Sequence, residues 1–171
     1  RRNMGLEFVT TTFLKFSKAV DIPIPNLFIK HVTFLKTQGA VFCTSLLYTG
    51  KSKNRLDVNF RHPFNDSIAQ CILLGTIWVT SGAIFRTTAL KLVNGFSESL
   101  TSNQERDLFW RLFLSKAKYV SFPCFTFIKI LNPQGISSTI NKKERMNNVH
   151  ALNVTIMDFL AQDNLDHATS R

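Results

Sequence analysis

The chain has 171 residues, of which 44% are hydrophobic and 19% are charged. This length allows one domain with a sizeable core, and the composition excludes a disordered tail, a collagen-like chain and a disulfide-rich miniprotein. The formal net charge of +10 favours anionic partners: nucleic acid, an acidic membrane surface or a phosphorylated small molecule. Charge alone does not choose among them.

The first third of the chain predicts a helix, a strand and a turn. The apolar spacing of residues 26–38 indicates a helix that begins at Asn26 and ends at Gly39. Strand-forming residues fill 40–48, and the polar stretch 49–54 is typical of a turn.

The uncharged run 67–85 is long enough to be tested as a membrane span. A glycine in its middle and a Ser-Gly pair near its end interrupt it, however. We therefore expect a short helix that begins at Asp66 and ends at Gly75, followed by a buried strand over 76–85.

The second half continues the alternation of helices and strands. A short helix is predicted from Thr87 or Thr88 to the Asn94-Gly95 pair, and a longer one over 105–115. Acidic side chains in the first turn of that longer helix suit the helix dipole.

One or two strands are predicted over 117–131, around Pro123, and apolar spacing over 138–161 predicts an amphipathic C-terminal helix. The alternating pattern is that of an α/β domain with a mixed sheet flanked by helices. We see no internal repeat and expect residues 1–171 to form a single domain.

Simple catalytic and metal-binding motifs are missing from the sequence. No P-loop, GxGxxG, GxSxG or HExxH pattern occurs, and no cysteine or histidine cluster has zinc spacing. The three cysteines, Cys43, Cys71 and Cys124, each lie in an apolar run, which predicts buried free thiols. The four histidines are far apart, so each is expected to be a surface or helix residue.

Six short blocks occur in a fixed order between residue 2 and about residue 145. The blocks are RNMG (2–5), IPN (24–26), TSGAIFR (80–86), NGF (94–96), QERDLFWRL (104–112) and NPQGISS (132–138). Their order and spacing resemble the catalytic domain of the family 2 glycosyltransferases, which have the GT-A fold. The resemblance implies an incomplete GT-A fold here, without the N-terminal units that hold the nucleotide base. It also implies transfer of a sugar from a nucleotide-diphosphate donor to an acceptor hydroxyl.

The resemblance assigns roles to individual residues. Glu105 aligns with the family's Asp, the base that deprotonates the acceptor. The donor-binding residues would be Arg2, Asn3, Lys18 and Asp21, and the acceptor-side residues would be Ser81, Gly82, Ala83, Asp107 and Trp110. We expect Asp21 and Glu105 around one cleft, with Arg2 and Asn3 near the Asp21 side.

The metal-binding acids of the family are missing. Its DxD motif, which holds Mg²⁺ or Mn²⁺ against the donor diphosphate, aligns with Lys18-Ala19-Val20, so Asp21 alone remains. A hard cation needs oxygen ligands. We therefore expect no metal in this chain, and little or no sugar transfer by the chain alone. Lys18 is a candidate point-charge substitute for the metal.

Two alternatives to a glycosyltransferase stay open. One is a non-catalytic relative of the same fold that binds glycan or protein, and the other is a basic nucleic-acid-binding domain. Nucleic acid is the less expected partner, because it is supported by net charge alone. The leading interpretation implies a nucleotide-sugar donor, a glycan or lipid-linked acceptor and a cytoplasmic location, with an anionic membrane surface as a further candidate partner.

Overall fold

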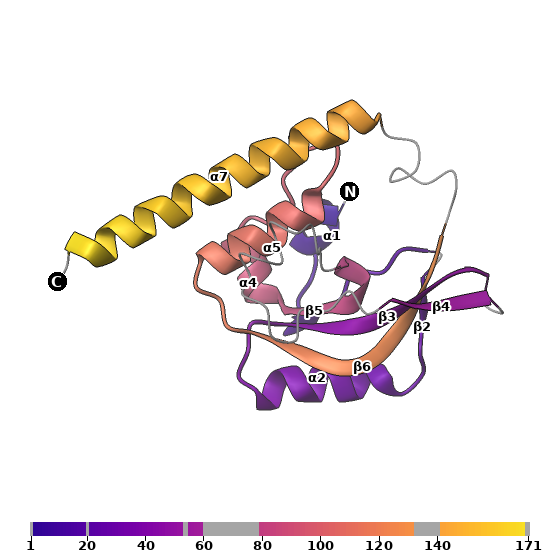
Figure 1. Ribbon diagram of the computed structural model, residues 1–171. Coiled ribbons are helices and arrows are strands. Elements are labelled where there is room, and N and C mark those ends of the chain that lie inside the picture. The colour runs from indigo at the N-terminus through magenta and orange to yellow at the C-terminus, as the bar shows by residue number, and fades with distance from the viewer. Residues whose placement is uncertain (1, 20, 53–54, 60–78, 132–140, 170–171) are drawn as a thin grey trace.

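The computed structural model describes residues 2–19, 21–52, 55–59, 79–131 and 141–169. Within this part of the chain, the strands form one mixed sheet with the order β1-β5-β3-β6-β2, and β4 pairs with β3 outside that path (Figure 1). The strands are β1 (Phe13–Leu14), β2 (Ile22–Pro23), β3 (Phe42–Ser52), β4 (Arg55–Asn59), β5 (Ala83–Arg86) and β6 (Tyr119–Ile130). β3 and β6 run parallel, whereas the other pairs are antiparallel. The mixed α/β sheet predicted from the sequence is confirmed.

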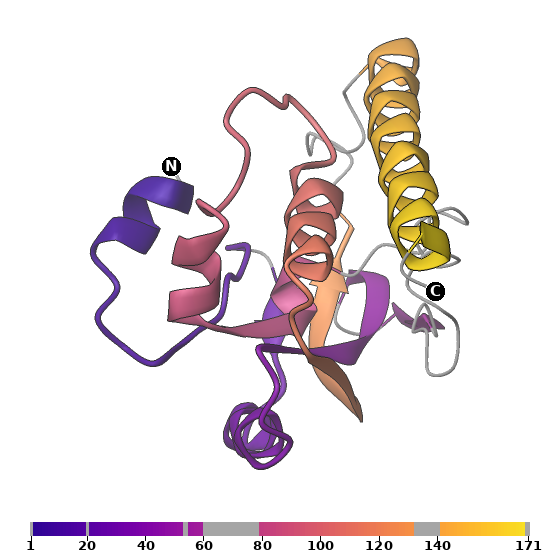
Figure 2. The ribbon, with the colours of Figure 1, turned by 90° about the vertical axis from the view of Figure 1, so that its left-hand side faces the viewer.

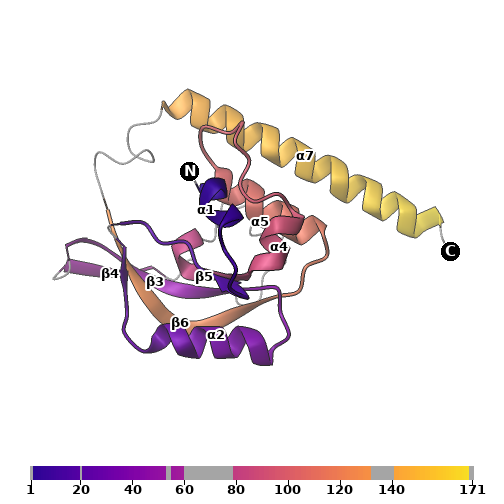
Figure 3. The ribbon, with the colours of Figure 1, turned by 180° about the vertical axis from the view of Figure 1, so that it is seen from behind.

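Helices cover both faces of the sheet. They are α1 (Arg2–Glu7), α2 (Leu27–Thr37), α4 (Thr87–Leu92), α5 (Gln104–Leu114) and α7 (Lys142–Thr169). α2 lies against one face, whereas α1, α4 and α5 lie over the other (Figures 1 and 3). The view in Figure 2 places α5 between α4 and α7. A single 3-10 turn, η1 (Thr80–Gly82), leads directly into β5.

The central strands divide the apolar side chains between two cores. Phe42 and Phe85 point toward α4 and α5, and the residues next to them in sequence, Cys43 and Ile84, belong to the core on the α2 side. All four side chains are fully buried. This two-residue alternation is what a strand covered on both faces requires. Burial also raises the pKa of the free Cys43 thiol to about 12.

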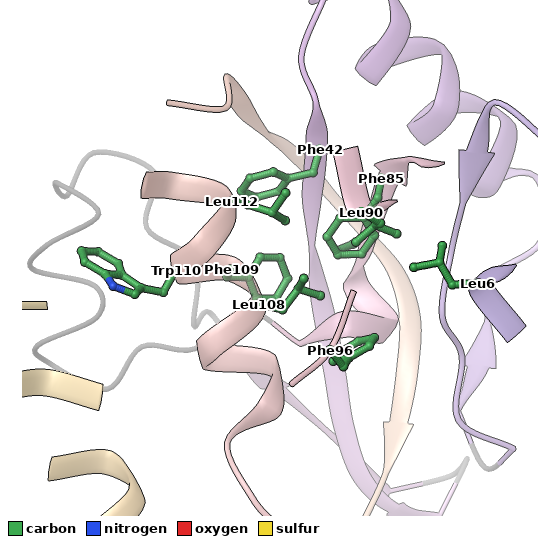
Figure 4. Close-up of a cluster of buried hydrophobic side chains, with 10 residues drawn as sticks. Leu6, Phe42, Phe85, Leu90, Phe96, Leu108, Phe109, Trp110 and Leu112 are labelled. Carbon is green, nitrogen blue, oxygen red and sulfur yellow. The ribbon is translucent and has the colours of Figure 1, made fainter. Parts of the chain in front are cut away.

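The larger core is built mainly from aromatic rings (Figure 4). Its buried members are Leu6, Phe42, Ala83, Phe85, Leu90, Phe96, Leu108, Phe109, Trp110 and Leu112. The Phe109 ring of α5 lies 5.5 Å from that of Phe42 and 5.6 Å from that of Phe85, measured between centroids. α5 is therefore held to the sheet by ring packing, which gives some of the 16 phenylalanines of the chain their place.

Helix boundaries agree closely with the sequence pattern. α2 follows Asn26 as predicted, but Asn26 adopts a left-handed φ of 64° and its side chain makes no capping bond. α4 begins at Thr87 and is followed by Asn94 and Gly95, with φ of 57° and 62°. Asparagine and glycine tolerate this backbone region, which ends a helix sharply.

Two strand predictions need correction. The turn predicted over 49–54 is wrong in its first part, because β3 continues to Ser52 and β4 begins at Arg55. Pairing with β6, which reaches Gly50, extends β3 through residues that look turn-like in isolation. The strand predicted over 76–85 is shorter than expected, since η1 precedes β5. Cys71 and the helix predicted at 66–75 lie outside the described residues.

Pro123 lies within one strand rather than between two. The parallel ladder pairs Ser45 with Phe122 and then Leu46 with Phe125, so the register shifts at the proline. Proline has no N–H to donate to a ladder and is tolerated at such a bulge.

The C-terminal helix is longer than the predicted 138–161. α7 contacts the domain near its start, where Asn148 Nδ2 donates to Ser102 Oγ at 3.0 Å. Met146 is 64% exposed, and Met157 is 52% exposed. No helix in the described part of the chain is long and apolar enough to cross a membrane.

Candidate functional site

Asn3 fastens α1 to the segment that follows α4. Its Nδ2 donates to the Phe96 carbonyl at 2.7 Å and to Glu98 Oε1 at 3.1 Å, and its Oδ1 accepts from the Phe96 N–H at 2.8 Å. The neighbouring Arg2 guanidinium lies 4.3 Å from the centre of the Phe96 ring. The RNMG and NGF blocks, 93 residues apart at the Asn3–Phe96 contact, therefore form one structural unit.

Glu105 is paired with Arg2 at the start of α5. Arg2 Nη1 lies 3.3 Å from Glu105 Oε1, and Arg2 Nη2 donates to Gln104 Oε1 at 3.0 Å. The Glu105 side chain is 25% exposed, so the rest of the domain covers it only in part. The contacts of Arg2 and Asn3 are thus with the Glu105 side of the molecule, whereas we expected both residues near Asp21.

Asp107 and Trp110, also on α5, make contacts that stabilise the fold. The Asp107 carboxylate accepts from Arg111 at 2.6 and 3.0 Å, and Arg111 also donates to the carbonyls of Val93 and Gly95. This network ties the end of α4 to α5. Trp110 is 2% exposed, so its ring belongs to the core and offers no surface to an acceptor.

A second polar cluster surrounds Asp21. Asp21 is 7% exposed, and its Oδ2 accepts from Ser81 Oγ, whereas Oδ1 has no hydrogen-bond partner among the described residues. Lys15 Nζ donates to the Ser81 carbonyl and lies 5.4 Å from the centre of the Phe127 ring. Burial lowers the pKa of Lys15 to about 8, although the negative charge of Asp21 offsets part of that effect.

Residues 81–83 were predicted to lie on the acceptor side. They are buried and form part of the polar cluster around Asp21. Ser81 and Ala83 are almost fully buried, and the Gly82 carbonyl accepts from Ser45 Oγ at 2.9 Å. A Cβ at Gly82 would lie 2.8 Å from Phe127 Cε1. The block therefore packs against β3 and β6 and holds Ser81 against Asp21.

The two clusters are joined by aromatic packing rather than by contact between carboxylates. Phe16, next to Lys15, packs edge-on against Phe96 with centroids 5.0 Å apart. Phe96 in turn lies under Arg2, the partner of Glu105. No contact between Asp21 and Glu105 themselves is found in the described residues.

The residues at the Asp21 loop do not fit a divalent cation. Lys18 is exposed, and its carbonyl accepts from the Asp21 N–H at 3.0 Å. The charge of the Lys15 ammonium interacts with that of Asp21, and this ammonium would repel a metal ion. The described part of the chain holds no group of three histidine, cysteine or acidic side chains that could bind one.

Lys15 is the site residue that sequence reasoning missed. Its signal was a lysine inside the otherwise apolar stretch Phe13–Phe16. A charge at such a position requires a partner once the strand is buried, but the sequence does not say which one.

Comparison with known proteins identifies the fold. No family model and no curated protein sequence matches the chain. Solved structures of TarS from S. aureus do match. TarS 1-349 in complex with UDP-GlcNAc has 16% identity and a TM-score of 0.69, over 90% of this chain and 45% of that one. TarS 1-349 in complex with UDP has 16% identity and a TM-score of 0.60, over 77% and 39% of the two chains.

The fold is glycosyltransferase-like. It corresponds to an incomplete GT-A fold, as the family resemblance implied. A further TarS structure has 15% identity and a TM-score of 0.59, over 78% of this chain and 24% of that one. The chain spans less than half the length of these structures, and at such low identity the likeness concerns the fold alone.

The hydrogen bonds of Asn3 to Phe96 and Glu98, here called the Asn3 clamp, lead to a prediction about stability when Gly95 is substituted. Gly95→Ala places a Cβ 2.5 Å from Asn3 Oδ1 at a φ of +62°, so we expect a loss of about 2–4 kcal/mol from left-handed strain and displaced hydrogen bonds. Gly5→Ala is the matched control, since nothing lies within 4 Å of its Cβ and alanine favours a helix. Urea unfolding of both variants measures the difference. Equal unfolding midpoints would contradict the clamp.

Proposed function

We propose that this chain is part of a glycosyltransferase domain that binds a nucleotide-diphosphate sugar and transfers the sugar to an acceptor hydroxyl. The observation that supports this most is the fold match over 90% of the chain to a protein solved with UDP-GlcNAc. The order of the sequence blocks supports it independently, because RNMG, NGF and QERD come together around Glu105.

Glu105 is the proposed general base. It lies in the first turn of α5, is partly exposed and has Arg2 on Oε1. In the proposed reaction, the acceptor oxygen bonds to the anomeric carbon while the bond from that carbon to the diphosphate breaks. Glu105 takes the hydroxyl proton as the acceptor attacks. Arg2 holds the carboxylate in one orientation, which favours attack from a defined direction.

The Asp21 loop is the proposed donor side. Lys15 and the exposed Lys18 supply positive charge there, and Asp21 supplies a buried acceptor oxygen without a partner in the described residues. Positive charge stabilises the diphosphate leaving group as negative charge develops on it. Without a divalent ion this stabilisation is weaker, so we expect slow turnover.

A non-catalytic nucleotide-sugar-binding relative is the second candidate. It is favoured by the loss of metal-binding side chains at the Asp21 loop, where two acids of the family pattern are replaced by Lys18 and Val20. Such a protein would bind the donor and release no UDP.

Calorimetric titration of the full protein with UDP-GlcNAc and UDP tests donor binding, and UDP release tests turnover. Free N-acetylglucosamine is the control ligand, since it lacks the diphosphate. We expect saturable binding of both nucleotides and slow UDP release. Binding without release would select the non-catalytic relative. Failure to bind UDP-, GDP- and ADP-sugars would overturn both candidates.

A further inference from the structure

We propose that the Lys15 ammonium takes the place of the divalent cation on the donor side, so that this site binds its diphosphate ligand without metal. The proposal rests on the proposed function and deepens it. It also moves the positive charge from Lys18, the substitute expected from the sequence, to a residue in the strand region before the acidic loop.

The position of Lys15 is fixed from three sides. Lys15 directly follows β1, and its Nζ donates to the Ser81 carbonyl in η1. The Phe127 ring of β6 lies 5.4 Å from Nζ, and the charge of Asp21 acts on Nζ as well. Lys15 is partly buried. A long, flexible side chain is thereby held in one place, as a bound ion would be.

Asp21 explains why a cation is needed at this position. Its carboxylate is more than nine-tenths buried, and the hydroxyl of Ser81 satisfies only Oδ2. A buried carboxylate is costly unless a positive charge or hydrogen bonds compensate it. Lys15 provides that charge from within the chain. A Mg²⁺ or Mn²⁺ ion placed at Asp21 would be repelled by the Lys15 ammonium, whose charge interacts with that carboxylate.

The ammonium keeps capacity for a ligand. It has three N–H groups, and the contacts given for the described residues use one of them, on the Ser81 carbonyl. Lysine binds phosphate as a point charge, so the remaining N–H groups can donate to diphosphate oxygens. Lys18 lacks this anchoring: its side chain is exposed, and its described contacts with Asp21 are through the backbone.

Titration calorimetry with UDP as the probe tests the proposal in the full protein, once with EDTA and once with Mn²⁺. We expect the wild-type Kd to agree within about twofold between the two conditions, and Lys15→Met to weaken binding by about tenfold or more in EDTA. Lys30→Met on α2 is the control for lost surface charge, because Lys30 is exposed. Its Kd should stay at the wild-type value.

A folding defect is separated from lost ligand contact by Lys15→Arg, which keeps the charge and should recover part of the affinity. Circular dichroism confirms that each variant is folded. UDP binding that requires Mn²⁺ would overturn this inference and leave the proposed function standing. A larger loss with Lys18→Met than with Lys15→Met would also overturn it. If UDP binds in neither condition, both this inference and the proposed function fail.

Discussion

Replacing Phe85 with alanine is expected to lower the free energy of unfolding by about 3–5 kcal/mol, the cost of removing a buried aromatic ring. Phe85 is fully buried on β5, which lies between β1 and β3 in the sheet. Its ring lies 6.0 Å from that of Phe42 and 5.6 Å from that of Phe109. The rigid sheet below and α5 above leave little room for the cavity to collapse, which favours the upper part of that range.

Phe8→Ala is the matched control for Phe85→Ala, because the substitution is the same and Phe8 is 79% exposed. We expect the control to change stability by about 0.5 kcal/mol or less. Chemical unfolding followed by circular dichroism measures both variants. Similar unfolding midpoints for the two would mean that the larger core is not assembled as described.

The helices and strands that could be predicted from the sequence are those whose conformation follows from the pattern of their own residues rather than from contacts with distant ones. The helix over 105–115 was recognised because its apolar residues recur at helical spacing and its acidic residues cluster in the first turn, and α5 spans Gln104–Leu114. The strand over 40–48 was recognised from its β-branched and aromatic residues. Its extension to Ser52 was missed because pairing with β6 and β4, not local preference, continues it.

The same limit applies to the site. Glu105 could be named from its block, but its pairing with Arg2 joins residues 103 positions apart in the sequence. Lys15 stood out only as a charge in an apolar stretch, and its partners Asp21 and Ser81 come from a loop and from η1. Contacts of this range depend on the complete fold, so no local pattern could give them.

The two clusters divide the proposed reaction between them. In the proposal, the Lys15 ammonium near Asp21 binds the leaving group, and Glu105, oriented by Arg2, is the base. Phe16 and Phe96 pack together between the two. A ring contact of this kind fixes distance without adding charge, so each pair keeps its own electrostatic surroundings. The Asn3 clamp on Phe96 is therefore expected to influence both sides of the site.

Glu105→Gln is expected to lower kcat for sugar transfer by about 10²–10⁴-fold, the contribution of a positioned general base. Glutamine has nearly the same shape, and its carbonyl can still accept from Arg2, which now lies 3.3 Å from Oε1. It cannot take the proton of the acceptor hydroxyl. The Kd for UDP-GlcNAc should therefore change by about threefold or less, because the proposed donor side is the Asp21 loop.

UDP release at saturating donor and acceptor measures this effect, with calorimetry for the Kd. Glu7→Gln is the control for a lost carboxylate, because Glu7 is exposed at the end of α1. Glu105→Asp should retain part of the turnover, since a carboxylate remains on a shorter arm. If Glu105→Gln turns over as fast as the wild type, Glu105 serves only to anchor Arg2, and the base must be sought elsewhere. A large rise in Kd with unchanged kcat would instead place Glu105 in donor binding, because only an interaction made in the transition state lowers kcat selectively.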